Sequence, residues 1–138
     1  MEKALLDTDI LSEVLKRKDP QVLAAAGQYL AEHQRFAFSA ITLYEIVRGM
    51  QSNRATRQLA EFLNTVRTSD VLPISTPVLL RAADLWAEGR NAGRPLGDAD
   101  LIIAATALVN GLDLVTGNLS HFSWIDGLHL NDWRQIAP

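Results

Sequence analysis

The sequence predicts a single α/β domain in which a central parallel β-sheet of four to five strands is flanked by α-helices. Short apolar runs of strand length alternate with stretches of helical period along the chain, which is the pattern of this class. The length of 138 residues suits one domain. The pattern contains no internal repeat, low-complexity tract or linker. We therefore expect residues 1–138 to form one folding unit.

The strands are expected at the short apolar runs "KALL" (3–6), "FAFS" (36–39), "VLPI" (71–74) and "LDLVT" (112–116), with "LHL" (128–130) as a fifth. The helices are expected between them, over residues 9–17, 20–33, 42–52, 54–66, 77–91 and 98–110. Pro20 and Pro77 stand near helix starts, where a missing amide hydrogen costs little, and Gly111 stands where the last helix should end. Strands that alternate with helices pair in parallel through right-handed crossovers.

The composition indicates a protein that folds without covalent cross-links. The chain contains no Cys, which fits a reducing cytoplasm, and its length allows a core large enough to fold without disulfides. The opening residues "MEKALLDTDI" contain no apolar stretch of the kind found in a signal peptide. No apolar run approaches the roughly 20 residues that a membrane span needs. We expect a cytoplasmic protein with no membrane partner.

The net charge of −3 argues against a protein that holds nucleic acid on a broadly basic surface. It does not exclude an RNA or DNA partner, because a bound Mg²⁺ reverses the local charge of an acidic site. Basic side chains that one face could present are Lys16, Arg17, Lys18, Arg48, Arg54 and Arg57. By themselves these residues are ordinary solvated charges.

Three polar clusters follow the predicted strands. They are residues 7–9 (Asp-Thr-Asp) after the first strand, residues 39–45 after the second, and residues 116–118 (Thr-Gly-Asn) after the fourth. Open parallel sheets bind ligands outside the carboxyl ends of their strands, so these clusters are expected at one edge. The acidic start of the helix at Asp98 joins them if that helix packs beside the sheet with its N-terminus at the same edge.

Each acid also has a purely structural interpretation. Thr8 and Asp9 are alternative N-caps for the first helix. Asp98 is a candidate cap for the late helix, where the helix dipole favours Asp100 in the first turn. The residues alone leave capping and function open for each of these acids.

Glu45 has the strongest structural interpretation. The letters "TLYE" match a capping box, with Thr42 as the N-cap and Glu45 three residues later. On a helical wheel Glu45 lies opposite the apolar stripe Leu43, Ile46, Val47 and Met50. The pattern alone therefore predicts a solvated cap residue.

Several acids at one sheet edge would repel one another unless they share a cation. Oxygen ligands without Cys, and without a His pair at metal-binding spacing, suit Mg²⁺ or Mn²⁺ rather than Zn²⁺. The three histidines, His33, His121 and His129, are scattered along the chain. The sequence thus predicts a site for a hard divalent cation.

Two metal–carboxylate chemistries fit this layout, and the first is that of a phosphatase of the haloacid dehalogenase type. "LLDTDIL" resembles the Asp-x-Asp strand end of that family, and "GDAD" resembles its late acidic motif. The family also needs a lysine from the middle or later part of the chain, whereas the only lysines here are Lys3, Lys16 and Lys18. Its late motif should also follow a strand, and here a Pro-containing stretch precedes it.

The second chemistry is that of the PIN-domain ribonucleases, and the chain resembles in particular the VapC-type toxins of bacterial toxin–antitoxin pairs. "LLDTDILSEVLK" resembles the opening strand and acid of the family, and "SAITLYEIVRGM" its Ser-x-x-Thr-x-x-Glu helix. "DADLIIAATALVNG" resembles its Asp-x-x-Ile-Ala-Ala helix, and "LVTGNLSHFSWIDGLHLNDW" its closing segment. Each motif is weak alone, but all four in order are highly specific and cover the whole chain.

The resemblance implies a single PIN-like domain whose acidic metal site is Asp7, Glu45 and Asp100. It thereby overrules the wheel interpretation of Glu45. It also selects Asp100 over Asp98. The acid of the family stands three residues before the Ile of Ile-Ala-Ala, which is Ile103 in this chain. Asp98 is left as a cap or a neighbour of the ligands, since residues two apart on a helix face different ways.

The sequence departs from the family in the closing segment. Members often add a fourth acid there, and the candidate positions in this chain are Asn118 and His121. The resemblance therefore leaves the number and affinity of bound metal ions open.

The implied activity is hydrolysis of an RNA phosphodiester by a water molecule that Mg²⁺ (or Mn²⁺) activates. Orienting roles around the acids or the scissile phosphate are expected for Thr8, Ser39, Thr42, Asp98, Thr116, Asn118 and His121. The implied partners are an RNA substrate, a second copy of the chain, and an antitoxin whose C-terminal segment lies in the substrate groove. The competing hypothesis is a PIN-like scaffold that keeps the fold and binds a partner but has no catalytic activity. Replacement of one of the three acids in the sequence would indicate such a scaffold.

Overall fold

Five short strands form the centre of the molecule. The computed structural model describes residues 1–135. It places the strands at β1 (Ala4–Leu6), β2 (Ala37–Ser39), β3 (Asp70–Leu72), β4 (Asp113–Val115) and β5 (Leu130–Asn131). All described pairings are parallel, as predicted. The hydrogen bonds, however, divide the strands into one sheet of order β1-β4-β5 and one pair, β2-β3. Strands β1 and β2 lie side by side where the sheet and the pair meet.

The helices agree with the predicted series to within two residues at each end. They are α1 (Thr8–Lys16), α2 (Pro20–His33), α3 (Ala40–Ser52), α4 (Thr56–Arg67), α5 (Thr76–Asn91), α6 (Asp98–Val109) and α7 (Leu119–Phe122). The short helix α7 was not predicted, because four residues are too few to reveal a helical period. None of the helices within residues 1–135 is long and apolar enough to cross a membrane. The predicted single domain also includes residues 136–138, which lie outside the described residues.

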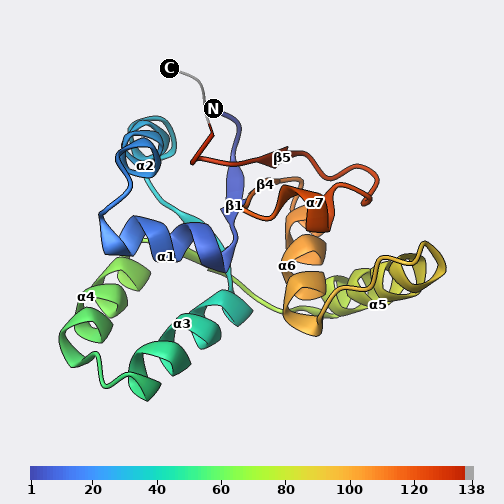
Figure 1. The fold of residues 1–138 in the computed structure, drawn as a ribbon, viewed down its shortest axis with the longest axis horizontal. Coiled ribbons are helices and arrows are strands. Elements are labelled where there is room, and N and C mark those ends of the chain that lie inside the picture. Colours follow the sequence, from blue (N-terminus) through green and yellow to red (C-terminus); the bar gives the residue numbers. More distant parts are fainter. Residues whose placement is uncertain (136–138) are drawn as a thin grey trace.

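Side chains that alternate along the strands divide the core into two halves. Ala4 and Leu6 of β1 belong to one apolar cluster, whereas Leu5 between them belongs to the other. Successive residues of a strand point to opposite faces, so the strands β1 to β4 contribute to both clusters. The first cluster is closed by α1 to α4 and the second by α5 and α6, and Figure 1 shows these two groups of helices on opposite sides of the strands. The parallel strands therefore end at one edge between the two groups.

Candidate active site

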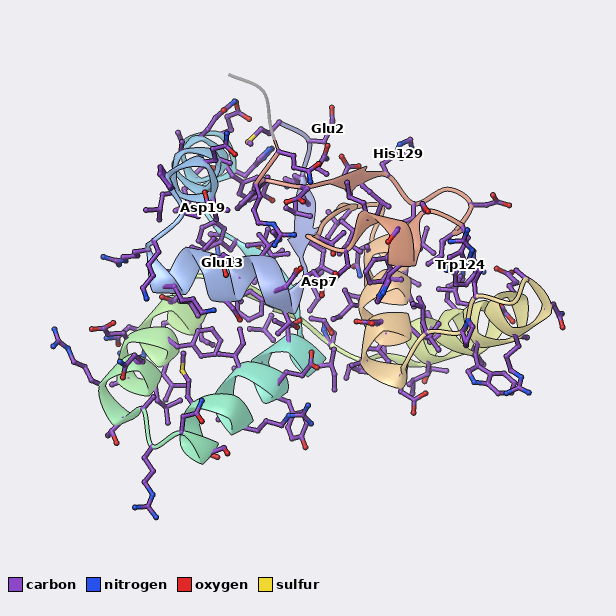
Figure 2. The ribbon with its side chains drawn as sticks, viewed as in Figure 1. Glu2, Asp7, Glu13, Asp19, Trp124 and His129 are labelled. Carbon is purple, nitrogen blue, oxygen red and sulfur yellow. The ribbon has the colours of Figure 1, made fainter. Side chains whose placement is uncertain are left out.

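Asp7 lies where β1 ends and α1 begins, near the centre of the molecule (Figure 2). Its side chain, rather than that of Thr8 or Asp9, is the N-cap of α1, because Oδ1 accepts the amide of Thr8 at 2.8 Å. The capping prediction for Thr8 and Asp9 was therefore wrong by one or two positions. Asp7 is only 4% exposed. Burial, followed by the charge of Asp9, raises the pKa of Asp7 to about 7.

The turn after β4 holds the carboxylate of Asp7. The hydroxyl of Thr116 donates to Oδ2 of Asp7 at 2.7 Å, and the same hydroxyl accepts the amide of Asn118 at 3.0 Å. Because β1 and β4 are paired, the residues that follow them, Asp7 and Thr116, meet at the same edge. The polar clusters predicted after the first and fourth strands are thus in contact.

Asp9 contacts the same turn from the first turn of α1. Its Oδ2 accepts the amide of Gly117 at 3.0 Å and the side-chain amide of Asn118 at 3.5 Å. Burial raises the pKa of Asp9, while the nearby amides of Gly117 and Ile10 lower it. Its second oxygen, Oδ1, is buried without a hydrogen-bond partner among the described residues. Asn118 therefore contacts an acid of the first cluster.

Glu45 was predicted from the wheel to be a solvated cap, and this interpretation was wrong. Helix α3 begins at Ala40 with Ser39 as its N-cap, so Thr42 and Glu45 lie inside the helix and form no capping box. The hydroxyl of Thr8 donates to Oε1 of Glu45 at 2.8 Å and lies 3.0 Å from the hydroxyl of Thr42. The side chain of Glu45 is 23% exposed, and its second oxygen, Oε2, lies 3.9 Å from the guanidinium of Arg48.

Asp98 and Asp100 occupy different environments at the start of α6. Gly97 is the N-cap of α6, so the interpretation of Asp98 as the N-cap was also wrong. Asp98 lies exposed in the first turn of the helix. Asp100 is half-buried. Burial, followed by the charge of Glu45, raises the pKa of Asp100; Asp9 adds to this, and the exposed His121 lowers it. Asp100 thus lies in the electrostatic field of α1, α3 and α7, whereas Asp98 faces solvent.

Ser39, although fully buried, makes its described side-chain hydrogen bond to the amide of Ile41 and none to the acids. Two neighbours of the site were absent from the set of predicted site residues. Asp9 was placed in the polar cluster after the first strand and considered as a cap, but it was not assigned to the metal site. Arg134, which donates to the carbonyl of Gly117 at 2.8 Å, gives no local signal in the sequence. Only the parallel pairing of β4 with β5 brings it to this edge.

The acids provide oxygen donors whose charge is only partly compensated, by Arg48 beside Glu45 and by Arg134 near Asp9. None of the ion pairs within residues 1–135 involves Asp7, Asp9 or Asp100. This donor set suits Mg²⁺ or Mn²⁺, and the unpartnered oxygen of Asp9 is one position at which a cation or water would satisfy a buried charge. In the described part of the chain, no three His, Asp or Glu side chains stand close enough to hold an ion as they are. Mg²⁺ often uses only one or two carboxylates and completes its shell with water.

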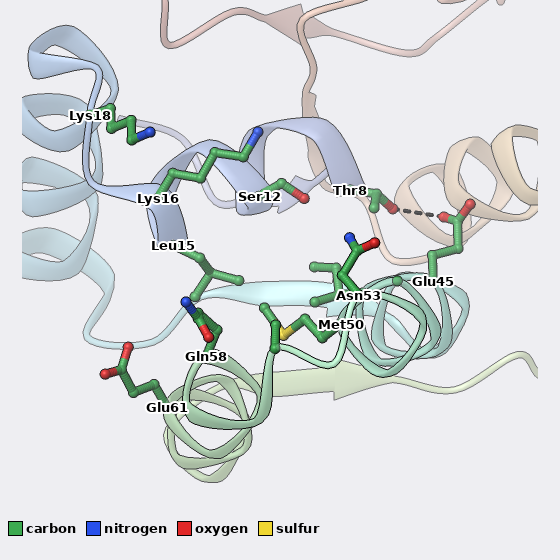
Figure 3. Close-up of a pocket in the computed structure, with 13 residues that line it drawn as sticks. Thr8, Ser12, Leu15, Lys16, Lys18, Glu45, Met50, Asn53, Gln58 and Glu61 are labelled. Atoms are coloured by element: carbon green, nitrogen blue, oxygen red, sulfur yellow. Dashed lines mark hydrogen bonds between the residues drawn. The ribbon is translucent and has the colours of Figure 1, made fainter.

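A groove of about 540 Å³ begins at Thr8 and Glu45 and runs along α1, α3 and α4 (Figure 3). Its lining includes the apolar Leu15, Ile46 and Met50, the cationic Lys16 and Lys18, and a second acid, Glu61. Asn53 and Gln58 add amide groups. The acidic site therefore opens into a partly apolar channel with cationic side chains.

Comparison with known proteins gives concordant matches over almost the whole chain. The model of the family described as PIN domain matches residues 4–127. The chain is 31% identical over 134 residues to the tRNA(fMet)-specific endonuclease VapC of Shigella flexneri, covering 96% of this chain and 99% of that protein. It is 30% identical over 139 residues to Ribonuclease VapC1 of Haemophilus influenzae, covering 95% and 98%.

The fold is also found in a solved complex. A chain in the crystal structure of DNA-bound VapBC from Salmonella typhimurium superimposes with a TM-score of 0.84 at 30% sequence identity, covering 96% of this chain and 99% of that one.

Proposed function

We infer that this chain, which belongs to the PIN-domain family, is a ribonuclease toxin of the VapC type that acts within a toxin–antitoxin pair. The observation that carries the chemistry is the buried Asp7, whose pKa is raised beside Asp9 and Asp100. A protein gains nothing in stability from acids that repel one another in a partly buried site, so a cationic ligand is the natural explanation. We propose that this ligand is Mg²⁺ or Mn²⁺.

In this proposal Asp7, Glu45 and Asp100 hold the metal ion. When bound, Mg²⁺ lowers the pKa of a coordinated water and offsets negative charge on a phosphate. Thr116 and the amide of Thr8 keep the carboxylate of Asp7 in one orientation. The hydroxyl of Thr8 keeps Glu45 turned towards α1. These hydrogen bonds reduce the reorganisation that the acids need when an ion and a scissile phosphate arrive.

The groove beside Glu45 is the proposed path of the RNA strand. Lys16 and Lys18 are placed to contact phosphates, and the apolar part of the lining offers a surface against which a base can stack. We further propose that the C-terminal segment of the antitoxin enters the same groove and thereby excludes RNA. The relative from Shigella flexneri is named for tRNA(fMet), so this tRNA is the first substrate to test. Because cellular RNA is the substrate, we place the protein in the cytoplasm.

We also propose that two copies of the chain associate through α5. This helix exposes Leu79, Leu80 and Trp86, of which Leu80 is 64% exposed. An exposed apolar surface of this kind is more common at a protein interface than on a free surface. The guanidinium of Arg90 lies 4.9 Å from the ring centre of Trp86 and would give the interface a polar border.

The alternatives are less well supported. A phosphatase of the haloacid dehalogenase type needs a strand before its late acids, but residues 92–97 contain none and α5 precedes them. An inactive PIN-like scaffold needs no acids, yet Asp7, Glu45 and Asp100 are all retained. Asp7 in particular is buried at an energetic cost that a scaffold would not require.

Induced expression in growing bacteria, combined with mapping of RNA 5′ ends, tests this function. We expect growth arrest with new ends in a defined RNA, neither of which occurs with Glu45→Gln or when the antitoxin is co-expressed. Growth arrest without RNA cleavage, or arrest that Glu45→Gln fully preserves, would contradict the proposal.

A further inference from the structure

The two carboxylate oxygens of Asp9 have different surroundings. Oδ2 accepts hydrogen bonds from the amide of Gly117 and from the side chain of Asn118, at 3.0 and 3.5 Å. Oδ1 is buried and has no hydrogen-bond partner in the described chain, although the nearby amide of Ile10 lowers the pKa of this carboxyl. An unpaired buried oxygen of a carboxylate is costly, and such atoms commonly mark a bound ion or water.

The turn that holds Oδ2 is closely packed. A Cβ atom at position 117 would lie 2.6 Å from Oδ2 of Asp9 and would clash with the guanidinium of Arg134, so any other residue there would displace these side chains. Arg134 is itself fixed, because it donates to the carbonyl of Gly117 at 2.8 Å and from Nε to Asp132 at 3.3 Å. Asp9 is therefore held in one orientation, in which Oδ2 is used by the turn and Oδ1 is not.

The hydrogen bonds to Oδ2 do not explain why this residue is an acid. Both donors are N–H groups, and the single carbonyl oxygen of an asparagine would accept them equally well. The charge of the Arg134 guanidinium lowers the pKa of Asp9, but the two groups form no ion pair among the described residues. Pinning the turn therefore does not by itself account for a partly buried negative charge. Asp9 also lies close enough to Asp7 and Asp100 for its charge to raise the pKa of each. Its charge therefore acts on two of the proposed metal ligands.

We propose that Asp9 is a fourth metal-directed carboxylate of this site, and that its Oδ1 supplies the negative charge that the chain lacks at His121. The inference rests on the proposed metal-dependent function and deepens it. The turn Thr116–Asn118 then has a double role, because Thr116 orients Asp7 while Gly117 and Asn118 orient Asp9. Arg134 donates to the carbonyl of Gly117 in this turn and lies close enough to Asp9 to lower its pKa.

Calorimetric titration of Mn²⁺ alone into the purified chain tests the proposal. Asp9→Asn keeps an acceptor for Gly117 but removes the charge, so we expect the affinity for Mn²⁺ to fall by about tenfold or more. The melting temperature of the metal-free variant should rise, because a buried charge is removed. Asp126→Asn, which removes an exposed acid that has no assigned role at the site, is the matched control and should bind Mn²⁺ as the wild type does.

The possible outcomes separate this inference from the proposed function. Wild-type affinity in folded Asp9→Asn would overturn the inference and leave the metal-dependent function in place. Absence of Mn²⁺ binding in the wild-type protein would overturn both. If Asp9→Asn does not fold, as judged by circular dichroism, Asp9→Ser provides the same test with a smaller acceptor, and retained affinity there would be equally contrary.

Discussion

The hydroxyl of Thr116 donates a hydrogen bond of 2.7 Å to Oδ2 of Asp7, joining residues that are 109 positions apart in the sequence. The bond exists because β1 and β4 are paired in parallel and end at the same edge. It lowers the pKa of Asp7 against the larger effect of burial, and so favours the charged form that the proposed metal ion requires. The fold thus directly supports the chemistry of its central acid.

Thr116→Val should weaken the binding of Mn²⁺ by roughly tenfold, since loss of a hydrogen bond that orients a ligand typically costs ten- to a hundredfold. The matched control is Thr106→Val, which removes an equally buried hydroxyl that bonds only to the carbonyl of Ile102. Both variants should lose stability, but only the first should lose metal affinity. Equal affinity in the two variants, measured by calorimetry, would be contrary to the role assigned to Thr116.

Asp100→Asn should remove most RNA cleavage, whereas Asp98→Asn should retain it. Asp98 is exposed in the first turn of α6, where its charge contributes about 0.3–1 kcal/mol through the helix dipole and nothing to a ligand set. Asp100 is half-buried near Glu45, Asp9 and His121. Cleavage rates of the two purified variants on one RNA decide the matter, and similar losses in both would show that their roles are divided wrongly.

The metal-free protein should lose stability as the pH rises. Asp7 has a pKa of about 7 in the folded chain, against 3.8 as the ordinary value, so the folded state binds the proton more tightly. The stabilisation that this proton provides is complete at pH values below the ordinary pKa of 3.8. It disappears as the pH rises through the folded-state pKa of about 7. Thermal unfolding should therefore occur at lower temperature at about pH 8 than at about pH 5.

Two controls accompany this pH series. Asp7→Asn should remove much of the pH dependence, because it removes the titrating group while its carbonyl oxygen still caps α1. Adding Mn²⁺ at the higher pH should restore stability by binding the charged acids. A melting temperature of the metal-free wild type that rises between the two pH values would contradict the environment assigned to Asp7.

His121→Asp should tighten the binding of Mn²⁺. His121 stands in the closing segment, where a fourth acid is otherwise expected, and it lies close enough to Asp100 to affect its pKa. We expect the wild-type chain to bind about one Mn²⁺ weakly, because Mg²⁺-type sites of few carboxylates rely on water and substrate oxygens. Two tight sites in the wild type, or unchanged affinity in the variant, would refute this expectation in a calorimetric titration.

The elements that local patterns specify were predicted well. Helix α2 occupies residues 20–33 as expected, because Asp19 caps it and Pro20 is its first residue. The two-stranded pair β2-β3 and the sheet β1-β4-β5 could not be distinguished from one continuous sheet, since strand composition does not reveal which edges pair.

At the candidate site, too, local patterns do not reveal contacts between elements that are distant in the sequence. The helical wheel placed the side chain of Glu45 in solvent, but its hydrogen-bond partner Thr8 lies on another helix, 37 positions away in the sequence. The resemblance to a family, rather than the residue pattern, is what led to the prediction of Glu45 as a metal ligand. Asp9 and Arg134 were missed because their significance depends on the turn at Gly117, which only the assembled strands bring near them.

The most direct test of a metal-dependent ribonuclease is the cleavage of tRNA(fMet) and total RNA by the purified chain, with Mg²⁺ and with excess EDTA. Wild-type protein and the control Asp98→Asn should cleave RNA in Mg²⁺ and fail in EDTA, while Asp7→Asn should fail in both. Asn at position 7 can keep the cap to Thr8 and a hydrogen bond to Thr116, so loss of activity would reflect the lost charge. Cleavage that survives EDTA, or full activity in Asp7→Asn, would contradict the account.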